Sequence, residues 1–167
     1  MDILNDERKI RIGIICPSEI AIRRFMPALS KSQNFKFVGV GICGDNERDH
    51  IEKYRESDLL IKRQKNFSKA DDLIKVYGGK IFESYSDIVE SEEIDAIYIP
   101  LPPALHYKWC VKALKKGKHV LVEKPATIDL GNTEKMINIA KKSNLAIHEN
   151  YMFKFHKQIE GINNLIL

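Results

Sequence analysis

A lysine just beyond the end of a short apolar run is the residue of this sequence best placed to do chemistry. Lys124 follows the run 119–122 (HVLV) and Glu123, and it precedes Pro125. A lysine at the end of a strand can hydrogen-bond a substrate oxygen and supply or take a proton while a carbonyl is reduced or a hydroxyl is oxidised. Taken singly, Lys124 is a surface lysine and Glu123 an ion-pair partner for one of the many lysines.

A proline-rich loop precedes this segment. It runs Pro100-Leu101-Pro102-Pro103-Ala104-Leu105-His106, directly after the apolar residues 96–99. Prolines hold such a loop rigid, and its apolar surface is suited to covering a flat ring. His106 by itself is interpreted as a histidine that caps a helix.

The first turn of the chain occupies the place of a dinucleotide fingerprint but lacks its glycines. In G-x-G-x-x-G/A the glycines make the tight turn, let the backbone approach the pyrophosphate, and pack helix on strand. Cys16, Ser18 and Ala21 stand at those positions, and only Ala21 fits. Pro17 has no N–H for a phosphate and predicts an extended Cys16, whereas Ser18 can cap the helix or donate its hydroxyl to a phosphate. This loop alone supports a structural turn at least as well as a nucleotide cradle.

The end of the second strand gives a similarly open choice. An acidic residue there would hold the ribose hydroxyls of NAD, and a basic one would accept the 2′-phosphate of NADP. The chain has Ile42-Cys43-Gly44 at this point, with Asp45 slightly late. Asp45 is within reach of a ribose in principle, but a loop-capping aspartate is the simpler interpretation.

The segments that must position these residues alternate in hydrophobic period. Nearly continuous apolar runs predict parallel strands covered on both faces, and the stretches between them have helical spacing. The pattern predicts an α/β fold with a doubly wound, mostly parallel sheet and right-handed crossovers, whose ligands bind at the carboxyl ends of the strands. Strands are expected at 10–15, 37–42, 80–82, 96–99, 119–122 and 145–148, and helices around 21–29, within 45–77, at 87–89, over 107–116 and from near 129 to 142.

The composition excludes several functional classes. The 167 residues are 44% hydrophobic and 30% charged with a net charge of +4, and the two signs are interspersed, so neither a nucleic-acid nor a membrane partner is predicted. No apolar run approaches the roughly 20 residues of a membrane helix, and the acidic start at 1–7 is unlike a signal peptide. The prediction is a cytoplasmic protein. Cys16, Cys43 and Cys110 lie far apart and offer neither a disulfide framework nor a CxxC metal site.

Three segments of the chain resemble a known family. Residues 10–29 (IRIGIICPSEIAIRRFMPAL), 77–82 and above all 95–158 (beginning DAIYIPLPPALH, with GKHVLVEKP and ENYMFKFH) resemble the N-terminal half of the glucose–fructose oxidoreductase, inositol dehydrogenase and rhizopine catabolism (Gfo/Idh/MocA) family of NAD(P)-dependent oxidoreductases. The sequence of residues 95–158 is similar to that of the branch of the family that reduces keto groups on nucleotide-linked sugars, often with NADPH. This resemblance implies a Rossmann fold.

The resemblance also implies a site. Lys124 would be the catalytic lysine, Glu123 and Pro125 would shape its turn, the Lys124-Pro125 bond would be cis, and Asn150 would lie near the nicotinamide. The cofactor would be NADP or NAD, and the substrate a sugar or nucleotide-linked sugar. The residues expected to bind the cofactor are Cys16, Pro17, Ser18, Ile20, Cys43, Pro100, Leu101, Pro102, Leu105, His106, Glu123, Lys124 and Asn150.

The chain departs from the family in its glycine-poor turn, in the long charged stretch 45–69, and in its length. Residues 1–150 are expected to form the dinucleotide-binding domain, and 151–167 to begin a second, α+β substrate domain that is absent, so this chain alone would be nearly inactive. The apolar tail would then lack its cover and either disorder or mediate a homo-oligomer. The alternatives are a non-catalytic Rossmann-like module for partner binding or self-association, and a domain that binds another nucleotide-containing ligand.

Overall fold

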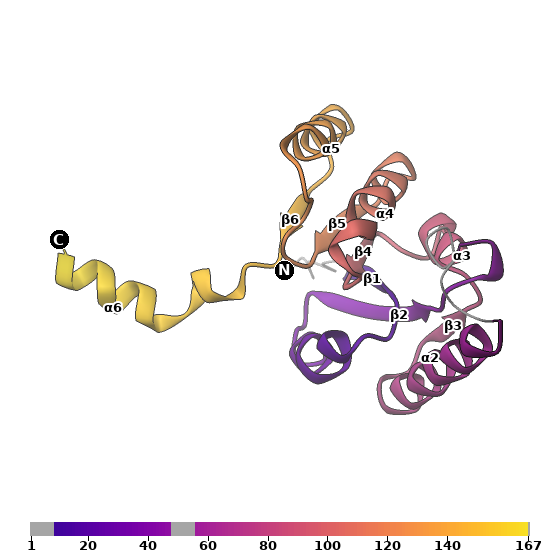
Figure 1. Ribbon diagram of the computed structural model, residues 1–167. Coiled ribbons are helices and arrows are strands. Elements are labelled where there is room, and N and C mark those ends of the chain that lie inside the picture. Colours follow the sequence, from indigo (N-terminus) through magenta and orange to yellow (C-terminus); the bar gives the residue numbers. More distant parts are fainter. Residues whose placement is uncertain (1–8, 48–55, 167) are drawn as a thin grey trace, which may run out of the picture.

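A single parallel sheet forms the centre of the molecule. The computed structural model describes residues 9–47 and 56–166. Its six strands lie in the order β3-β2-β1-β4-β5-β6, and every neighbouring pair is parallel, which confirms the doubly wound α/β prediction (Figure 1). The strands are β1 Ile10–Ile15, β2 Phe35–Gly41, β3 Lys80–Phe82, β4 Ala96–Ile99, β5 His119–Val122 and β6 Ile147–Glu149.

Helices cover the two faces of the sheet (Figure 1). On one face lie η1 Ala21–Phe25, α1 Met26–Leu29 and α2 Glu56–Tyr77; on the other lie α3 Tyr85–Glu90, α4 Pro103–Lys115 and α5 Leu130–Lys142. The strands divide their side chains between two buried clusters, as the period of two requires. In β4, for example, Ala96 and Tyr98 pack with Met26 and Leu29, whereas Ile97 and Ile99 join the cluster under α3, α4 and α5.

The first helix contains a π-helical turn next to its proline. The Met26 N–H donates to the Ala21 carbonyl, five residues back, and Pro27 then falls in the first turn of α1, where its missing N–H costs nothing. The extra residue in this turn changes the phase of the helix. Ala21, Met26 and Leu29 are buried, whereas Ala28 is exposed.

Most predicted boundaries agree with the structure. Helix α4, however, begins at Pro103, four residues before its predicted start, so His106 lies within the helix and does not cap it. Gly117 ends α4 with a positive φ of 74°, and the Asp129 carboxylate caps α5 by accepting from the Asn132 N–H at 2.8 Å. The sixth strand begins at Ile147, two residues later than expected, because the Leu145 N–H bonds the carbonyl of Ala140 at the end of α5.

The charged stretch is helical where it is described. Within α2, Ala70 and Leu73 are buried against the sheet, while most other described side chains of the helix are exposed or half-buried. The part of the predicted charged segment at 48–55, like the acidic start at 1–7, lies outside the described residues. Among the helices that are described, none has the length and apolar character needed to cross a membrane.

Candidate active site

The carboxyl ends of β4, β5 and β6 bring three predicted segments together. Ile99, Val122 and Glu149 are paired across the sheet. The ladder continues one residue further, because the Glu123 N–H donates to the Ile99 carbonyl at 3.2 Å and the Asn150 N–H donates to the Val122 carbonyl at 2.8 Å. The proline-rich loop, the Glu123-Lys124-Pro125 turn and Asn150 therefore begin side by side at one edge of the sheet.

Glu123 is a buried carboxylate that connects two of these segments. Its Oε1 accepts from the Tyr98 hydroxyl at 2.6 Å and from the Asn150 side-chain amide at 2.7 Å. Burial, reinforced by the hydrogen bond to Glu123, raises the pKa of Tyr98, so the phenol stays protonated and donates. Glu123 thus connects the ends of β4 and β6, and it has no lysine partner among residues 9–47 and 56–166. Tyr98, which the sequence reasoning missed, looked only like a core aromatic.

His106 ties the proline-rich loop to the lysine turn. Its Nε2 lies 2.6 Å from the Leu101 carbonyl and its Nδ1 lies 2.8 Å from the Pro125 carbonyl, and the side chain has no exposed surface. A carbonyl oxygen only accepts, so both contacts are hydrogen bonds when both ring nitrogens carry hydrogen. The His106 ring is enclosed and connects the two loops, and the contact of His106 with a cofactor stays a prediction.

Lys124 and Pro125 lie on the exposed side of these loops. The Lys124-Pro125 peptide bond is cis, as the family resemblance implies. The next N–H, of Ala126, donates to Glu149 Oε1 at 2.7 Å, which fastens the turn to the end of β6. Within the described part of the chain, the Lys124 ammonium has no hydrogen-bond or ion-pair partner. It is an exposed donor on a turn anchored at both ends.

The first turn keeps a glycine-like backbone without a glycine. Cys16 has a φ of +77°, so the prediction of an extended Cys16 is wrong. Its N–H donates to the Gly41 carbonyl at 3.0 Å, and its own carbonyl accepts from the Ser18 N–H at 2.9 Å, closing a tight turn around Pro17. These bonds outweigh the local preference of the residue before a proline, at a cost of ~1–2 kcal/mol for a left-handed residue. The Cys16 side chain packs against the core beside Tyr85, and burial raises the pKa of its thiol.

Ser18 caps the helix that follows this turn. Its Oγ accepts from the Ala21 N–H at 3.2 Å, and the hydroxyl hydrogen remains able to donate to a phosphate oxygen. Pro17 is buried, while Ser18 and Ile20 are half-buried. The backbone conformation and the hydroxyl donor are compatible with a phosphate at this turn.

The loop after β2 is held by a residue that the sequence reasoning did not single out. Glu47 accepts from the backbone N–H groups of Tyr85 and Ser86 at the start of α3, both at 2.7 Å, and from the Gly44 N–H at 3.0 Å. Asp45 is exposed and its carboxylate pairs with Arg63 at 2.8 Å. Glu47 is 38 residues from Tyr85, and no local motif signals that contact.

The predicted residues form two groups at the same edge of the sheet. Cys16, Pro17, Ser18, Ile20 and Cys43 follow β1 and β2, and the residues between Pro100 and Asn150 follow β4, β5 and β6. The groups meet where β1 adjoins β4 and the strand order reverses, which is where open α/β sheets bind their ligands. No cluster of three or more histidine, cysteine, aspartate or glutamate side chains that could hold a metal ion occurs among residues 9–47 and 56–166. The fold and this edge define a nucleotide-binding domain of the Rossmann type.

Comparison with known families agrees with that class. Residues 33–151 match the Gfo/Idh/MocA family, described as an oxidoreductase family with an NAD-binding Rossmann fold, and the chain belongs to it.

Its relatives include enzymes of nucleotide-sugar metabolism. The chain is 31% identical over 159 residues to the dTDP-3,4-didehydro-2,6-dideoxy-alpha-D-glucose 3-reductase of Streptomyces violaceoruber, covering 95% of this chain and 40% of that protein. The enzyme of the same name from Actinomadura kijaniata is 32% identical, with 94% and 41% covered. The crystal structure of KijD10, a 3-ketoreductase from A. kijaniata in complex with NADP and TDP-benzene, superposes with a TM-score of 0.79 at 30% identity, covering 95% of this chain and 42% of that one. The chain thus spans about two fifths of the length of these relatives.

Proposed function

We propose that this chain is the dinucleotide-binding domain of an oxidoreductase that transfers hydride between NADP or NAD and a keto or hydroxyl group of a sugar or nucleotide-linked sugar. One observation carries the proposal: an exposed Lys124, with no partner among the described residues, lies beside a buried Glu123 that accepts from Tyr98 at 2.6 Å and from Asn150 at 2.7 Å. A free ammonium on a turn anchored at both ends is a proton donor in a fixed place. The names of the relatives support the nucleotide-sugar substrate, and the KijD10 complexes support NADP.

The residues of the chain divide the work in this proposal. The 16–18 turn and the Ser18 hydroxyl would hold the phosphates, while the exposed Pro102 and the half-buried Asn150 would border the nicotinamide. The bound cofactor supplies the hydride. Lys124 would hydrogen-bond the substrate oxygen and supply or take the proton there, while Glu123 and His106 hold its turn in place.

Two further parts of the proposal concern the whole protein. Residues 1–150 would be the dinucleotide-binding domain, and 151–167 would begin a second domain that completes the substrate side of the site. Support comes from the relatives, which are more than twice as long as the matched segment. Turnover by the 167-residue chain alone is then expected to be very slow, because positioning of the substrate and exclusion of water would be incomplete.

Fluorescence titration of the purified chain with NADPH and NADH tests the proposal. Saturable binding of at least one cofactor is expected, and Ser18→Ala should weaken it about tenfold through loss of one hydroxyl donor to a charged phosphate. Thr127→Ala is the matched control, because Thr127 is a half-buried hydroxyl residue bonded to Thr133 and Asp129 within its own loop. Absence of saturable binding by either cofactor would refute the proposal.

A second candidate function rests on the first turn. The side chain at Cys16 and the missing N–H at Pro17 favour a domain that no longer binds dinucleotide and serves in partner binding or self-association. This alternative predicts no cofactor binding by the isolated chain and no effect of Ser18→Ala. The same titration therefore separates the two functions.

A further inference from the structure

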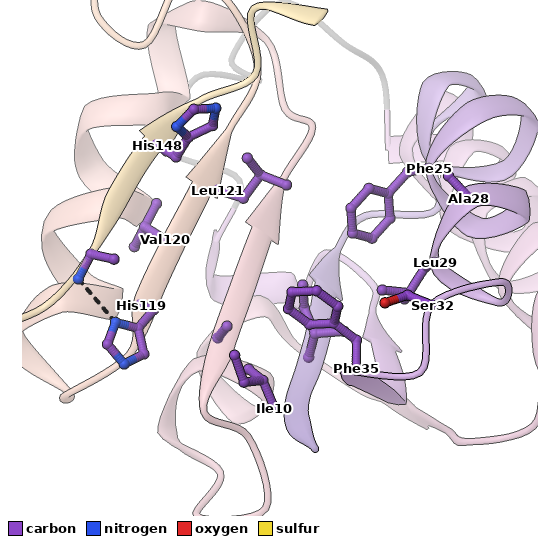
Figure 2. A pocket seen from close by; sticks show the side chains of 13 residues that line it. Ile10, Phe25, Ala28, Leu29, Ser32, Phe35, His119, Val120, Leu121 and His148 are labelled. Carbon is purple, nitrogen blue, oxygen red and sulfur yellow. Dashed lines mark hydrogen bonds between the residues drawn. The ribbon is translucent and has the colours of Figure 1, made fainter. Parts of the chain in front are cut away.

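Two grooves of similar volume lie along the sheet and differ in their lining. The apolar groove, of about 540 Å³, lies between β5 and the first helix, and Figure 2 shows Leu121 on one wall and Phe25 on the other. Among the described residues that line it, none is a lysine, arginine, aspartate or glutamate. The charged groove, of about 530 Å³, is lined by Arg63, Asp71 and Glu83 together with apolar side chains. Of the two, the charged groove is the one that offers a cation to an anionic ligand.

The charged groove continues the edge of the sheet that carries the first turn. Ile42 directly follows β2, Glu83 directly follows β3, and both line the groove. The opposite wall is α2, which is tied to the first turn because the Lys69 ammonium pairs with the Glu19 carboxylate at 2.8 Å. In a dinucleotide the pyrophosphate separates the nicotinamide from the adenosine. A cofactor with its nicotinamide near Lys124, beyond β4, therefore places its adenosine on the β2 and β3 side of the first turn.

The Arg63 side chain reaches from α2 to the ends of both strands. Its Nη1 lies 2.8 Å from Asp45 Oδ1, and its Nη2 lies 3.4 Å from Glu83 Oε2. The guanidinium is therefore held between the loops that leave β2 and β3. The exposed fractions of the two carboxylate side chains are 66% and 70%, whereas that of Arg63 is 31%. Ion pairs with such exposed carboxylates contribute little to stability, so a better ligand can replace them.

A phosphate monoester is a better ligand for this guanidinium than either carboxylate. It carries about −1.5 to −2 charges at pH 7, and its oxygens match the guanidinium fork. Phe67, one helical turn after Arg63, lines the same groove with 46% of its surface exposed and offers a flat ring on which a base can stack. Asp71, the other acidic residue of the α2 wall, pairs with Lys75 at 2.5 Å. The groove thus combines a guanidinium suited to a phosphate with an apolar surface suited to a base.

We propose that Arg63 binds the 2′-phosphate of NADP in the charged groove and thereby selects NADP over NAD. This inference rests on the proposed function, because it concerns the adenosine half of the same cofactor. On binding, the 2′-phosphate replaces Asp45 and Glu83 as the partner of the guanidinium. Until then the two carboxylates hold the Arg63 side chain in the groove, so little side-chain freedom is lost when the phosphate arrives. The negative charge of Asp45 opposes the phosphate and limits its affinity.

Fluorescence titration of the full chain with NADPH and with NADH measures this selectivity. The wild type should bind NADPH more tightly than NADH. Arg63→Ala should raise the Kd for NADPH about 10- to 30-fold, because it removes a charge-assisted contact with two hydrogen bonds. The Kd for NADH, which has no 2′-phosphate, should stay within about twofold, and this retained binding shows that the variant is folded. Lys65→Ala is the matched control, since it removes a positive charge from an exposed position of α2 outside the groove, and it should leave both Kd values within about twofold.

Two further variants distinguish Arg63 as a phosphate ligand from Arg63 as a support for Asp45. Arg63→Lys keeps the charge but loses the planar fork, so it should raise the Kd for NADPH by a smaller factor, about threefold to tenfold. Asp45→Asn removes the opposing charge and should lower the Kd for NADPH about threefold. If Asp45 instead accepts from the ribose hydroxyls of NAD, Asp45→Asn weakens NADH binding, and that result overturns the proposal.

The same titrations separate failure of this inference from failure of the proposed function. A wild type that prefers NADH, or an Arg63→Ala variant that loses affinity for both cofactors equally, overturns the role of Arg63 and leaves the proposed dinucleotide-binding function intact. A wild type that binds neither cofactor overturns both.

Discussion

Replacing Glu123 with alanine removes an acceptor that two other segments share. The Tyr98 hydroxyl, on a side chain with no exposed surface, would lose its partner at 2.6 Å, and the half-buried Asn150 amide would lose its partner at 2.7 Å. An orphaned buried donor costs ~1–3 kcal/mol. The Asn150 bond contributes roughly 0.5–1 kcal/mol, because water can replace part of it, and the lost packing adds about 1 kcal/mol. Relief of carboxylate burial offsets part of this total.

We therefore expect Glu123→Ala to lower the free energy of unfolding by about 3 kcal/mol, measured by urea denaturation followed by circular dichroism. The same loss lowers the melting temperature by roughly 6–12 °C for a chain of this size. Glu123→Gln keeps an oxygen acceptor in place and should lose only about 1 kcal/mol.

A double-mutant cycle provides the decisive control. Tyr98→Phe removes the other partner, so the Glu123→Ala, Tyr98→Phe double variant should be more stable than the sum of the single losses predicts, by about 1–2 kcal/mol. Strict additivity, or a Glu123→Ala loss below about 0.5 kcal/mol, would refute the assignment of Glu123 as the shared acceptor.

Three other outcomes follow from the described contacts. His106→Phe should cost about 2–4 kcal/mol in urea denaturation, since it deprives the buried Leu101 carbonyl of a donor, and wild-type stability would contradict this. Burial raises the pKa of Cys110 to about 12, so its thiol should resist iodoacetamide at pH 8 in the native chain and react in urea, as peptide mass spectrometry would show; rapid native labelling would contradict the burial. Lys112 beside Glu90 lowers the pKa of that carboxyl, so the pair stabilises the fold above the ordinary glutamate value of 4.5 and loses this contribution as the pH falls further. Lys112→Ala should reduce that acid dependence of the urea midpoint, and an unchanged pH profile would contradict the ion pair.

The turn after β1 keeps the backbone shape of a dinucleotide-binding turn without the glycines of the fingerprint. Three glycine positions of the fingerprint hold Cys16, Ser18 and Ala21, yet the backbone at Cys16 has the positive φ that a glycine would adopt. Strand neighbours impose that geometry through the Gly41 carbonyl. A missing glycine therefore changes the strain and the side chain of the turn, while its shape is retained.

The sequence by itself determined the features that depend on neighbours along the chain. The alternation of apolar runs with helical periods predicted all six strands and the parallel fold, and the Asp129 cap and the Gly117 end of α4 followed from residue types with local preferences. The segments that carry Lys124, Glu123 and Asn150 were also predicted, because parallel strands place their carboxyl ends at one edge of the sheet.

Only the tertiary structure decided which side chains hold that edge together. Glu123 bonds residues 25 and 27 positions away, Glu47 caps a helix 38 residues later, and His106 faces a carbonyl 19 residues on. Such contacts leave no local pattern, because their energy comes from burial and from partners that the fold brings together. The same reason explains the wrong prediction at Cys16 and the apolar groove that no strand pattern could reveal: both depend on what lies across the sheet.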